Sequence, residues 1–113
     1  MHIREDRSDG VTIIAPAGRV DSTTSSSLER HLLGLIGAGR HRLVVDLAEV
    51  DYISSAGLRV LLMLAKKTKE TRGALALCEM GDAVRQVFGL AGFLPLFTIE
   101  TSRDAAVTRV SAR

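Results

Sequence analysis

Two adjacent serines, Ser54 and Ser55, are the residues whose type and placement most directly suggest chemistry. They follow an apolar segment and a short polar connection at 48–53, and they stand at the start of a predicted apolar helix. Backbone N–H groups at a helix start have no partner within the helix, so a hydroxyl caps them and an added phosphate is stabilised there. Each serine is therefore either a structural cap, worth about 1 kcal/mol, or an acceptor of a phosphoryl group. The sequence leaves both interpretations open.

A second polar segment follows another predicted strand. Asp21 precedes a run of six serines and threonines at 22–27. Loops at the carboxyl ends of parallel strands share one edge of a sheet, so we expect Asp21, Ser22 and Thr23 to lie near Ser55 and to face one partner with it. The alternative is a hydroxyl-rich helix start that needs caps.

The sequence lacks the patterns of other catalytic and binding sites. His2, His31 and His41 do not have the spacing of metal ligands, and the single cysteine, Cys78, cannot complete a structural zinc site. Ser55 lies outside a Gly-x-Ser-x-Gly elbow, no histidine is placed to act as its base, and no phosphate-cradling glycine loop is present. We therefore expect no enzymatic activity, no metal and no cofactor.

Length and composition favour one soluble domain spanning residues 1–113, because a chain of this size builds one core but not two. A net charge of +2 and an aromatic content of 4% argue against nucleic-acid binding, which needs a basic face or stacking platforms. No apolar run approaches the roughly 20 residues that span a bilayer, and the charged N-terminus lacks the core of a signal peptide. We therefore expect a cytoplasmic protein without membrane contact, and the single cysteine fits a reducing compartment.

Hydrophobic periodicity predicts alternating strands and helices. β-Branched residues at 11–15 indicate a strand that ends or bulges at Pro16, and residues 3–7 pair with it through an Asp-Gly turn. Further strands are predicted at 43–47, 74–78 and 96–99, and helices at about 28–36, 55–71, 82–91 with Asp82 as its cap, and 102–110 with Ser102 as its cap. This order indicates an α/β domain: a mixed, mostly parallel sheet of about five strands, the N-terminal one antiparallel, with about four helices.

The predicted helix after Ser55 carries more apolar residues than a single buried stripe requires. Residues 60–64 are all apolar, so Val60, Met63 or Leu64 either packs deeply between the sheet and a neighbouring helix or reaches a partner. The second possibility leaves room for a weak homodimer.

Three segments carry a resemblance that covers essentially the whole chain: GRVD at 18–21, VVDL at 44–47 and, most specifically, YISSAGL at 52–58. The sequence resembles the STAS domain, which sulfate transporters and anti-sigma factor antagonists share. Because the chain is short and freestanding, it is most similar to the bacterial anti-anti-sigma factors. The resemblance implies a STAS-type fold.

In that family the last motif is most often Asp-Ser-Ser-Gly, and its first serine is phosphorylated. Aligning the glycine on Gly57 places the acceptor on Ser55, with Ser54 at the position of the family's Asp and Ala56 at that of its second serine. The resemblance thus implies phosphorylation at Ser55 and a partner-binding surface around it, made of Asp21, Ser22, Thr23, Ser54, Ser55, Gly57 and Leu58.

The resemblance also implies the partners of a transcription-regulating switch. The unphosphorylated protein would bind a GHKL-type serine kinase that is also an anti-sigma factor, and so free a sigma factor. The kinase would disable the protein by phosphorylating it, and a PP2C-type phosphatase would restore it. Two alternatives from other classes stay open: a structural STAS subunit of an ABC-type lipid transport complex, without a phosphorylation cycle, and a small-ligand or nucleotide-binding STAS module.

Overall fold

Strands and helices alternate along the chain of the computed structural model, which describes residues 1–111. The strands are β1 (His2–Ser8), β2 (Val11–Val20), β3 (Arg42–Asp46), β4 (Val50–Ile53), β5 (Ala74–Cys78) and β6 (Ile99–Glu100). The helices are α1 (Ser25–Gly37), α2 (Ser55–Glu70), α3 (Asp82–Leu90) and α4 (Arg103–Val110), with a 3-10 turn, η1 (Leu94–Leu96), before β6. Among these described residues, no helix combines the length and the apolar character that crossing a bilayer requires.

The sheet is mixed and mostly parallel, as the sequence predicted. Its strand order is β1-β2-β3-β5-β6, and β4 pairs with the part of β2 that extends past β3. Only β1 and β2 are antiparallel. Their hairpin turns at Asp9 and Gly10, which both have positive φ, 54° and 76°, as a tight turn between twisted strands requires.

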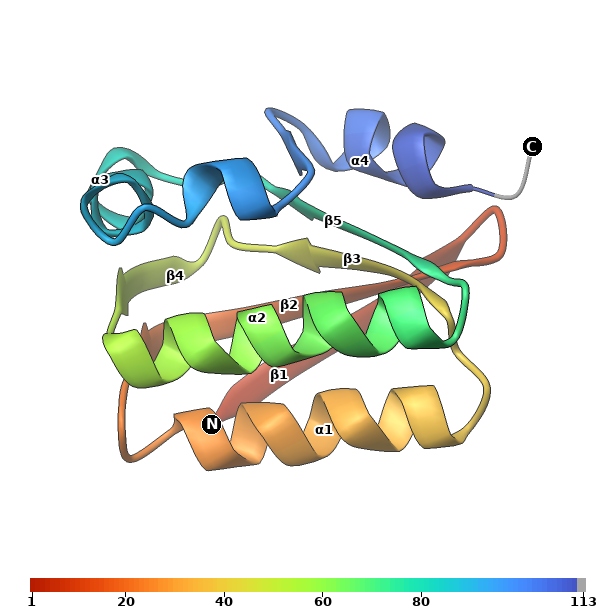
Figure 1. Cartoon of the computed structure of the whole chain (residues 1–113), viewed down its shortest axis with the longest axis horizontal. Helices are drawn as coiled ribbons and strands as arrows, with labels where there is room; N and C mark the ends of the chain where they lie inside the picture. Colours follow the sequence, from red (N-terminus) through yellow and green to blue (C-terminus); the bar gives the residue numbers. More distant parts are fainter. Residues whose placement is uncertain (112–113) are drawn as a thin grey trace.

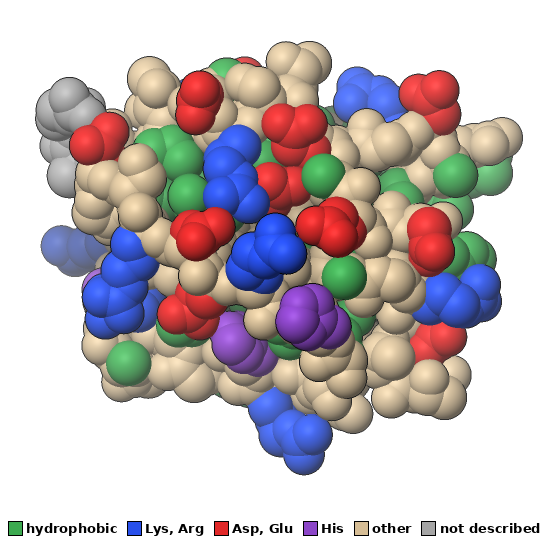
Figure 2. Space-filling model, turned by 180° about the vertical axis from the view of Figure 1, so that it is seen from behind, with side chains coloured by type: hydrophobic (Ala, Val, Ile, Leu, Met, Phe, Trp, Pro, Cys, Tyr) green, Lys and Arg blue, Asp and Glu red, His purple; other side chains and the backbone are tan. Residues whose placement is uncertain are grey.

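Helices cover both faces of the sheet. Helices α1 and α2 lie side by side on one face, where α3 also packs, and α4 lies on the other face (Figure 1). Alternate residues of β3 therefore enter different cores: Leu43 and Val45 pack toward α1 and α2, whereas Val44 packs toward α4. Burial on both faces explains why this strand is almost continuously apolar in sequence. From behind, acidic and basic side chains are interspersed over the surface (Figure 2).

Two predictions about strands were wrong. The segment at 48–53 was expected to be a polar connection, but it contains β4, whose Val50 and Ile53 are buried while its two middle residues are exposed. Pro16 was expected to end or bulge its strand, but β2 continues to Val20. Pro16 is tolerated because it lies between Ile14, the last residue of β2 that pairs with β3, and Gly18, the first that pairs with β4.

The C-terminal third of the chain differs from the prediction in two further details. Gly81, not Asp82, is the N-cap of α3; Asp82 is the first helical residue, where its negative charge still favours the helix dipole. Of the strand predicted at 96–99, only Ile99 lies in a strand, β6, because residues 94–96 form a 3-10 turn that accommodates the fixed φ of Pro95. The cap at Ser102 is confirmed, with its Oγ accepting a hydrogen bond from the backbone N–H of Ala105 at 3.1 Å.

An ion pair between a buried carboxylate and a partly exposed arginine fastens α4 to the sheet. Asp46, at the end of β3, accepts a hydrogen bond from Arg103 Nε at 2.8 Å through one carboxylate oxygen and from the Ala48 N–H at 2.9 Å through the other. Arg103 Nη1 also reaches Asp6 of β1 at 2.9 Å, and its backbone N–H donates to Glu79. The charge of Asp46 is therefore fully partnered although its side chain is only 7% exposed.

We expect Asp46→Ala to lower the free energy of unfolding by about 1–3 kcal/mol, because it removes the buried partner of Arg103 and the acceptor of the Ala48 N–H. Asp6→Ala is the matched control, since Asp6 pairs with the same guanidinium but is 49% exposed, and it should cost about 0–1 kcal/mol. Urea denaturation followed by circular dichroism measures both. Equal losses in the two variants would contradict a special role for the buried carboxylate.

Candidate functional site

The serine turn and the Asp21 loop meet at one edge of the sheet. Val20 and Ile53 are paired neighbours at the ends of β2 and β4, and the Ser54 N–H donates to the Val20 carbonyl at 2.8 Å. Asp21 follows β2 directly and Ser55 begins α2, so both polar segments leave the sheet at the carboxyl ends of adjacent parallel strands. The structure brings the two segments together, as the sequence indicated.

The two serines have different places in this turn. Ser54 is the N-cap of α2: its backbone is extended, and its Oγ accepts a hydrogen bond from the Gly57 N–H at 3.4 Å. Ser55 is the first residue of the helix and is exposed. The structural cap is therefore assigned to Ser54, and the Ser55 hydroxyl is left accessible at the surface.

Arg59 lies one helical turn beyond Ser55 and contacts it twice. Its Nε is 3.4 Å from the Ser55 carbonyl oxygen, and its Nη2 is 3.5 Å from the Ser55 hydroxyl. Both contacts are long, and both side chains are exposed. The sequence analysis did not identify Arg59, although a cation four residues after a candidate acceptor on a predicted helix was a usable signal.

The Asp21 side chain organises its own loop. Its Oδ1 accepts hydrogen bonds from the Thr23 hydroxyl at 2.7 Å, the Thr23 N–H at 2.9 Å and the Thr24 N–H at 3.3 Å. These bonds favour the ionised form and lower the pKa of Asp21 to about 2, with the Thr23 hydroxyl as the largest cause. Ser22 and Thr23 are exposed, so the loop presents hydroxyl groups at the same edge of the sheet as Ser55.

An arginine stacked on a tyrosine completes the exposed surface. Arg19 and Tyr52 are cross-strand neighbours on β2 and β4, and the guanidinium carbon lies 4.2 Å from the ring centroid. Arg19 Nε also lies 3.5 Å from Asp21 Oδ2. Sequence reasoning missed this pair because it missed β4, and nothing local connects residues that are 33 positions apart (52 − 19). Tyr52 keeps 39% of its surface exposed, which makes it available to a partner.

Gly57 and Leu58, predicted as partner contacts, are buried. A Cβ on Gly57 would lie 2.7 Å from Val20 Cγ1, 2.8 Å from Ile53 Cγ1 and 3.0 Å from the Val20 carbonyl oxygen. Only glycine therefore allows α2 to start so close to the ends of β2 and β4. In the free protein both residues support the site from beneath; their contact with a partner stays a prediction.

We define the Ser55 surface as the seven neighbouring residues that line this edge: Arg19, Asp21, Ser22, Thr23, Tyr52, Ser55 and Arg59. It carries two guanidinium groups and one carboxylate. Within residues 1–111, no side chain other than Arg59 lies within hydrogen-bond distance of the Ser55 hydroxyl, and no three His, Cys, Asp or Glu side chains cluster as metal ligands would. The arrangement suits a hydroxyl that receives a group from another protein.

The surplus apolar residues of α2 divide between the core and the surface. Val60 and Leu64 are buried, whereas Met63 is only partly buried.

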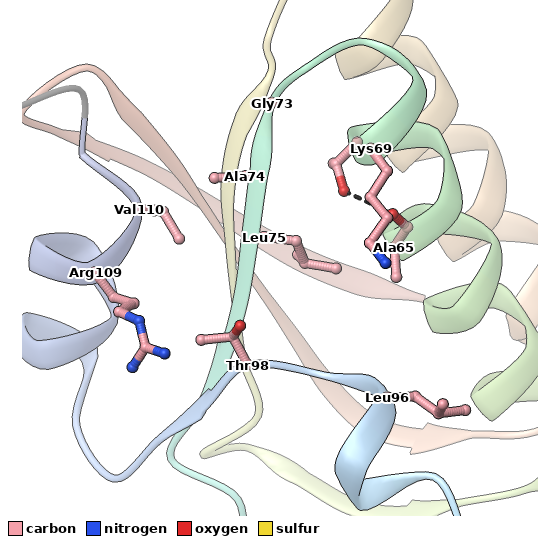
Figure 3. Close-up of a pocket in the computed structure, with 10 residues that line it drawn as sticks. Ala65, Lys69, Gly73, Ala74, Leu75, Leu96, Thr98, Arg109 and Val110 are labelled. Atoms are coloured by element: carbon pink, nitrogen blue, oxygen red, sulfur yellow. Dashed lines mark hydrogen bonds between the residues drawn. The ribbon is translucent and has the colours of Figure 1, made fainter.

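A hollow of about 250 Å³ lies near the other end of α2, between Lys69, the β5 residue Leu75 and Arg109 of α4 (Figure 3). Ser55 is 14 residues before Lys69 (69 − 55) on the same helix, so about 20 Å separates the hollow from the Ser55 surface.

Comparison with known proteins identifies relatives of this chain by sequence and by fold. Residues 2–106 match the family model of the STAS domain. BtrV of Bordetella bronchiseptica, which carries the name of an anti-sigma factor antagonist, is 43% identical over 106 residues, covering 94% of this chain and 91% of BtrV. A crystal structure of an anti-sigma factor antagonist from Mycobacterium paratuberculosis superposes with a TM-score of 0.87 at 27% identity, covering 96% of this chain and 92% of the other. The Bacillus cell fate determinant SpoIIAA in its phosphorylated form superposes with a TM-score of 0.73 at 16% identity, covering 96% and 99%.

We expect Gly57→Ala to destabilise the protein by about 1–3 kcal/mol, because the added methyl group meets the Val20 carbonyl and two core side chains. Gly34→Ala is the control: Gly34 is also helical, but its added Cβ has no atom within 4 Å, so this variant should be neutral or up to about 1 kcal/mol more stable. Urea unfolding measures the two changes. An unchanged free energy of unfolding in Gly57→Ala would contradict the steric role of Gly57.

The Asp21 loop should lose stability in acid. Because the pKa of Asp21 is about 2 in the folded protein and 3.8 ordinarily, its hydrogen bonds stabilise the fold above about pH 4 and are lost as the pH falls toward 2. The difference in unfolding free energy between the wild type and Asp21→Asn should therefore be constant above pH 4 and shrink below it. Urea titrations at several pH values measure this, and a difference that ignores pH would contradict the prediction.

Proposed function

The chain belongs to the STAS domain family, and from this premise we propose that it is an anti-sigma factor antagonist whose binding is disabled by phosphorylation of Ser55. The observation that carries the proposal is the position of the Ser55 hydroxyl. It is exposed at the first residue of α2, while the neighbouring Ser54 provides the cap, so Ser55 is free to be modified without loss of the helix start.

The partner in this proposal is a GHKL-type serine kinase that is also an anti-sigma factor. The unphosphorylated protein binds and sequesters the kinase, which releases a sigma factor. BtrV and the Mycobacterium protein, which are both named anti-sigma factor antagonists, support a partner of this kind. The protein itself acts as ligand and substrate, while ATP and magnesium belong to the kinase.

The modification is a phosphoryl transfer to and from Ser55. The Ser55 oxygen attacks the γ-phosphorus of ATP bound by the kinase, the bond to the β-phosphate oxygen breaks, ADP leaves, and the hydroxyl proton passes to a base of the kinase or to water. A PP2C-type phosphatase reverses the modification with a water molecule, which yields inorganic phosphate and the original hydroxyl. No group of this chain has to act as base in either step.

Charge at the docking surface accounts for the switching. A phosphoserine adds about −1.5 to −2 charges at neutral pH. A partner surface that accommodates the small neutral hydroxyl of Ser55 would have to desolvate this charge, and a loss of about 3 kcal/mol weakens binding roughly a hundredfold. The fold does not need to change, because free N–H groups and the helix dipole tolerate an anion at the start of α2. The phosphorylated form of SpoIIAA superposes on this chain with a TM-score of 0.73, which supports a fold that is kept after phosphorylation.

We expect the kinase and ATP to add the mass of one phosphoryl group to the wild type and to Ser54→Ala, but nothing to Ser55→Ala. Ser55→Ala should still bind the kinase, because it lacks only the acceptor oxygen. Ser54→Ala is the matched control, since it removes a neighbouring hydroxyl and a long capping bond without touching the acceptor. Intact-mass spectrometry measures the first result, and calorimetry measures the second.

Phosphorylated wild type should bind the kinase about a hundredfold more weakly than the unmodified protein. Labelling of Ser55→Ala at Ser54 would place the acceptor one residue earlier. Equal affinity of the modified and unmodified forms would remove the switch from the proposal and favour the structural-subunit alternative.

A further inference from the structure

We propose that Arg59 forms an ion pair with the phosphate on Ser55. The charge that this surface presents to a partner then depends on whether Ser55 is phosphorylated. The inference rests on the proposed phosphorylation of Ser55. It adds a role for a side chain that neither the sequence motif nor the comparisons assign.

The geometry places Arg59 beside the acceptor before any modification occurs. Arg59 Nη2 is 3.5 Å from the Ser55 hydroxyl oxygen, and its Nε is 3.4 Å from the carbonyl oxygen of the same residue. A phosphoryl group on that hydroxyl brings three further oxygens into the space around it. The planar guanidinium matches such a group with two parallel N–H donors, which makes arginine the favoured residue for phosphate recognition.

Within residues 1–111, no acidic side chain pairs with Arg59. Among the described residues, no carboxylate lies within 4.0 Å of its nitrogens, although Glu29 of α1 lines a shallow hollow with Arg59 and Ala56. The other arginine of the surface, Arg19, is already engaged, because it stacks on a ring and contacts Asp21 at 3.5 Å. Arg59 is therefore the guanidinium that is free to turn fully toward a phosphate.

The pairing changes what the surface offers to a partner. In the unmodified protein Arg59 presents a full positive charge next to a neutral hydroxyl. After modification the same guanidinium is held by the phosphate, and the pair together carries about −0.5 to −1 charge. A partner that presents a carboxylate to Arg59 in the first state thus loses an attraction and meets a repulsion in the second. The lost attraction and the new repulsion both weaken binding of such a partner.

The test places phosphoserine at position 55 by genetic code expansion, so that no kinase is required. The second pKa of the phosphate is then followed by ³¹P NMR in the otherwise unmodified protein, in Arg59→Gln, in Arg59→Lys and in Arg19→Gln. We expect the pKa of the phosphate to be about 0.3 to 0.7 of a pH unit higher in Arg59→Gln, which is the effect of losing an exposed ion pair. Arg59→Lys should keep part of the effect, because the charge remains without the planar donors.

Arg19→Gln serves as the matched control, because it removes an equal charge from the same surface. It should change the pKa of the phosphate by no more than about 0.1 of a pH unit, because salt screens an exposed charge that does not contact the phosphate. Contributions from the start of α2 are common to all four proteins and cancel. Both arginines are exposed, so the variants should fold, and an amide NMR spectrum that is unchanged away from the substituted residue and its direct contacts checks this.

Equal phosphate pKa values in the starting protein and Arg59→Gln would overturn the inference, as would equal changes in Arg59→Gln and Arg19→Gln. Neither result depends on the kinase. A failure of the kinase to label Ser55 would overturn the proposed function instead, so the two failures are distinguishable.

Discussion

The close approach of α2 to the ends of β2 and β4 is the constraint on which the rest of this site depends. Gly57 makes it sterically possible, and the Ser54 N–H bond to the Val20 carbonyl fixes the distance. Because α2 begins at this contact, the direction of its axis and the rotation of its first turn are set by the sheet. The exposure of Ser55 follows, since the residue after the cap has to point away from the strands that hold the cap.

This constraint separates structure from regulation within two adjacent serines. The Ser54 side chain accepts a hydrogen bond from the first turn of α2, whereas the Ser55 side chain is exposed and has Arg59 as its polar neighbour. A modification at Ser55 therefore changes the charge of the surface without breaking a bond that the fold uses. A switch of this kind needs no refolding, because the affinity of a partner responds directly to charge and desolvation.

The rest of the domain provides a rigid base for that surface. Two cores, one on each face of the sheet, hold the central strands, and the Asp46–Arg103 pair ties α4 to the end of β3. The Asp21 carboxylate orders the neighbouring loop, since it accepts hydrogen bonds from both Thr23 and Thr24. Binding to a preformed loop avoids the entropy of ordering it, which favours a partner that docks on this edge.

The sequence by itself determined the elements with a clear local period: the helix after Ser55, the doubly buried strand β3 and the serine cap of α4. It also placed the Asp21 loop near Ser55, because that follows from the direction of parallel strands. Local sequence patterns could not show that Ser54 caps α2 while Ser55 is exposed. They also did not reveal the four-residue strand β4 or the contact between Arg19 and Tyr52. Those features depend on strand register and on contacts between distant segments. Only the tertiary structure sets such contacts, because their energy comes from neighbours that local periodicity does not encode.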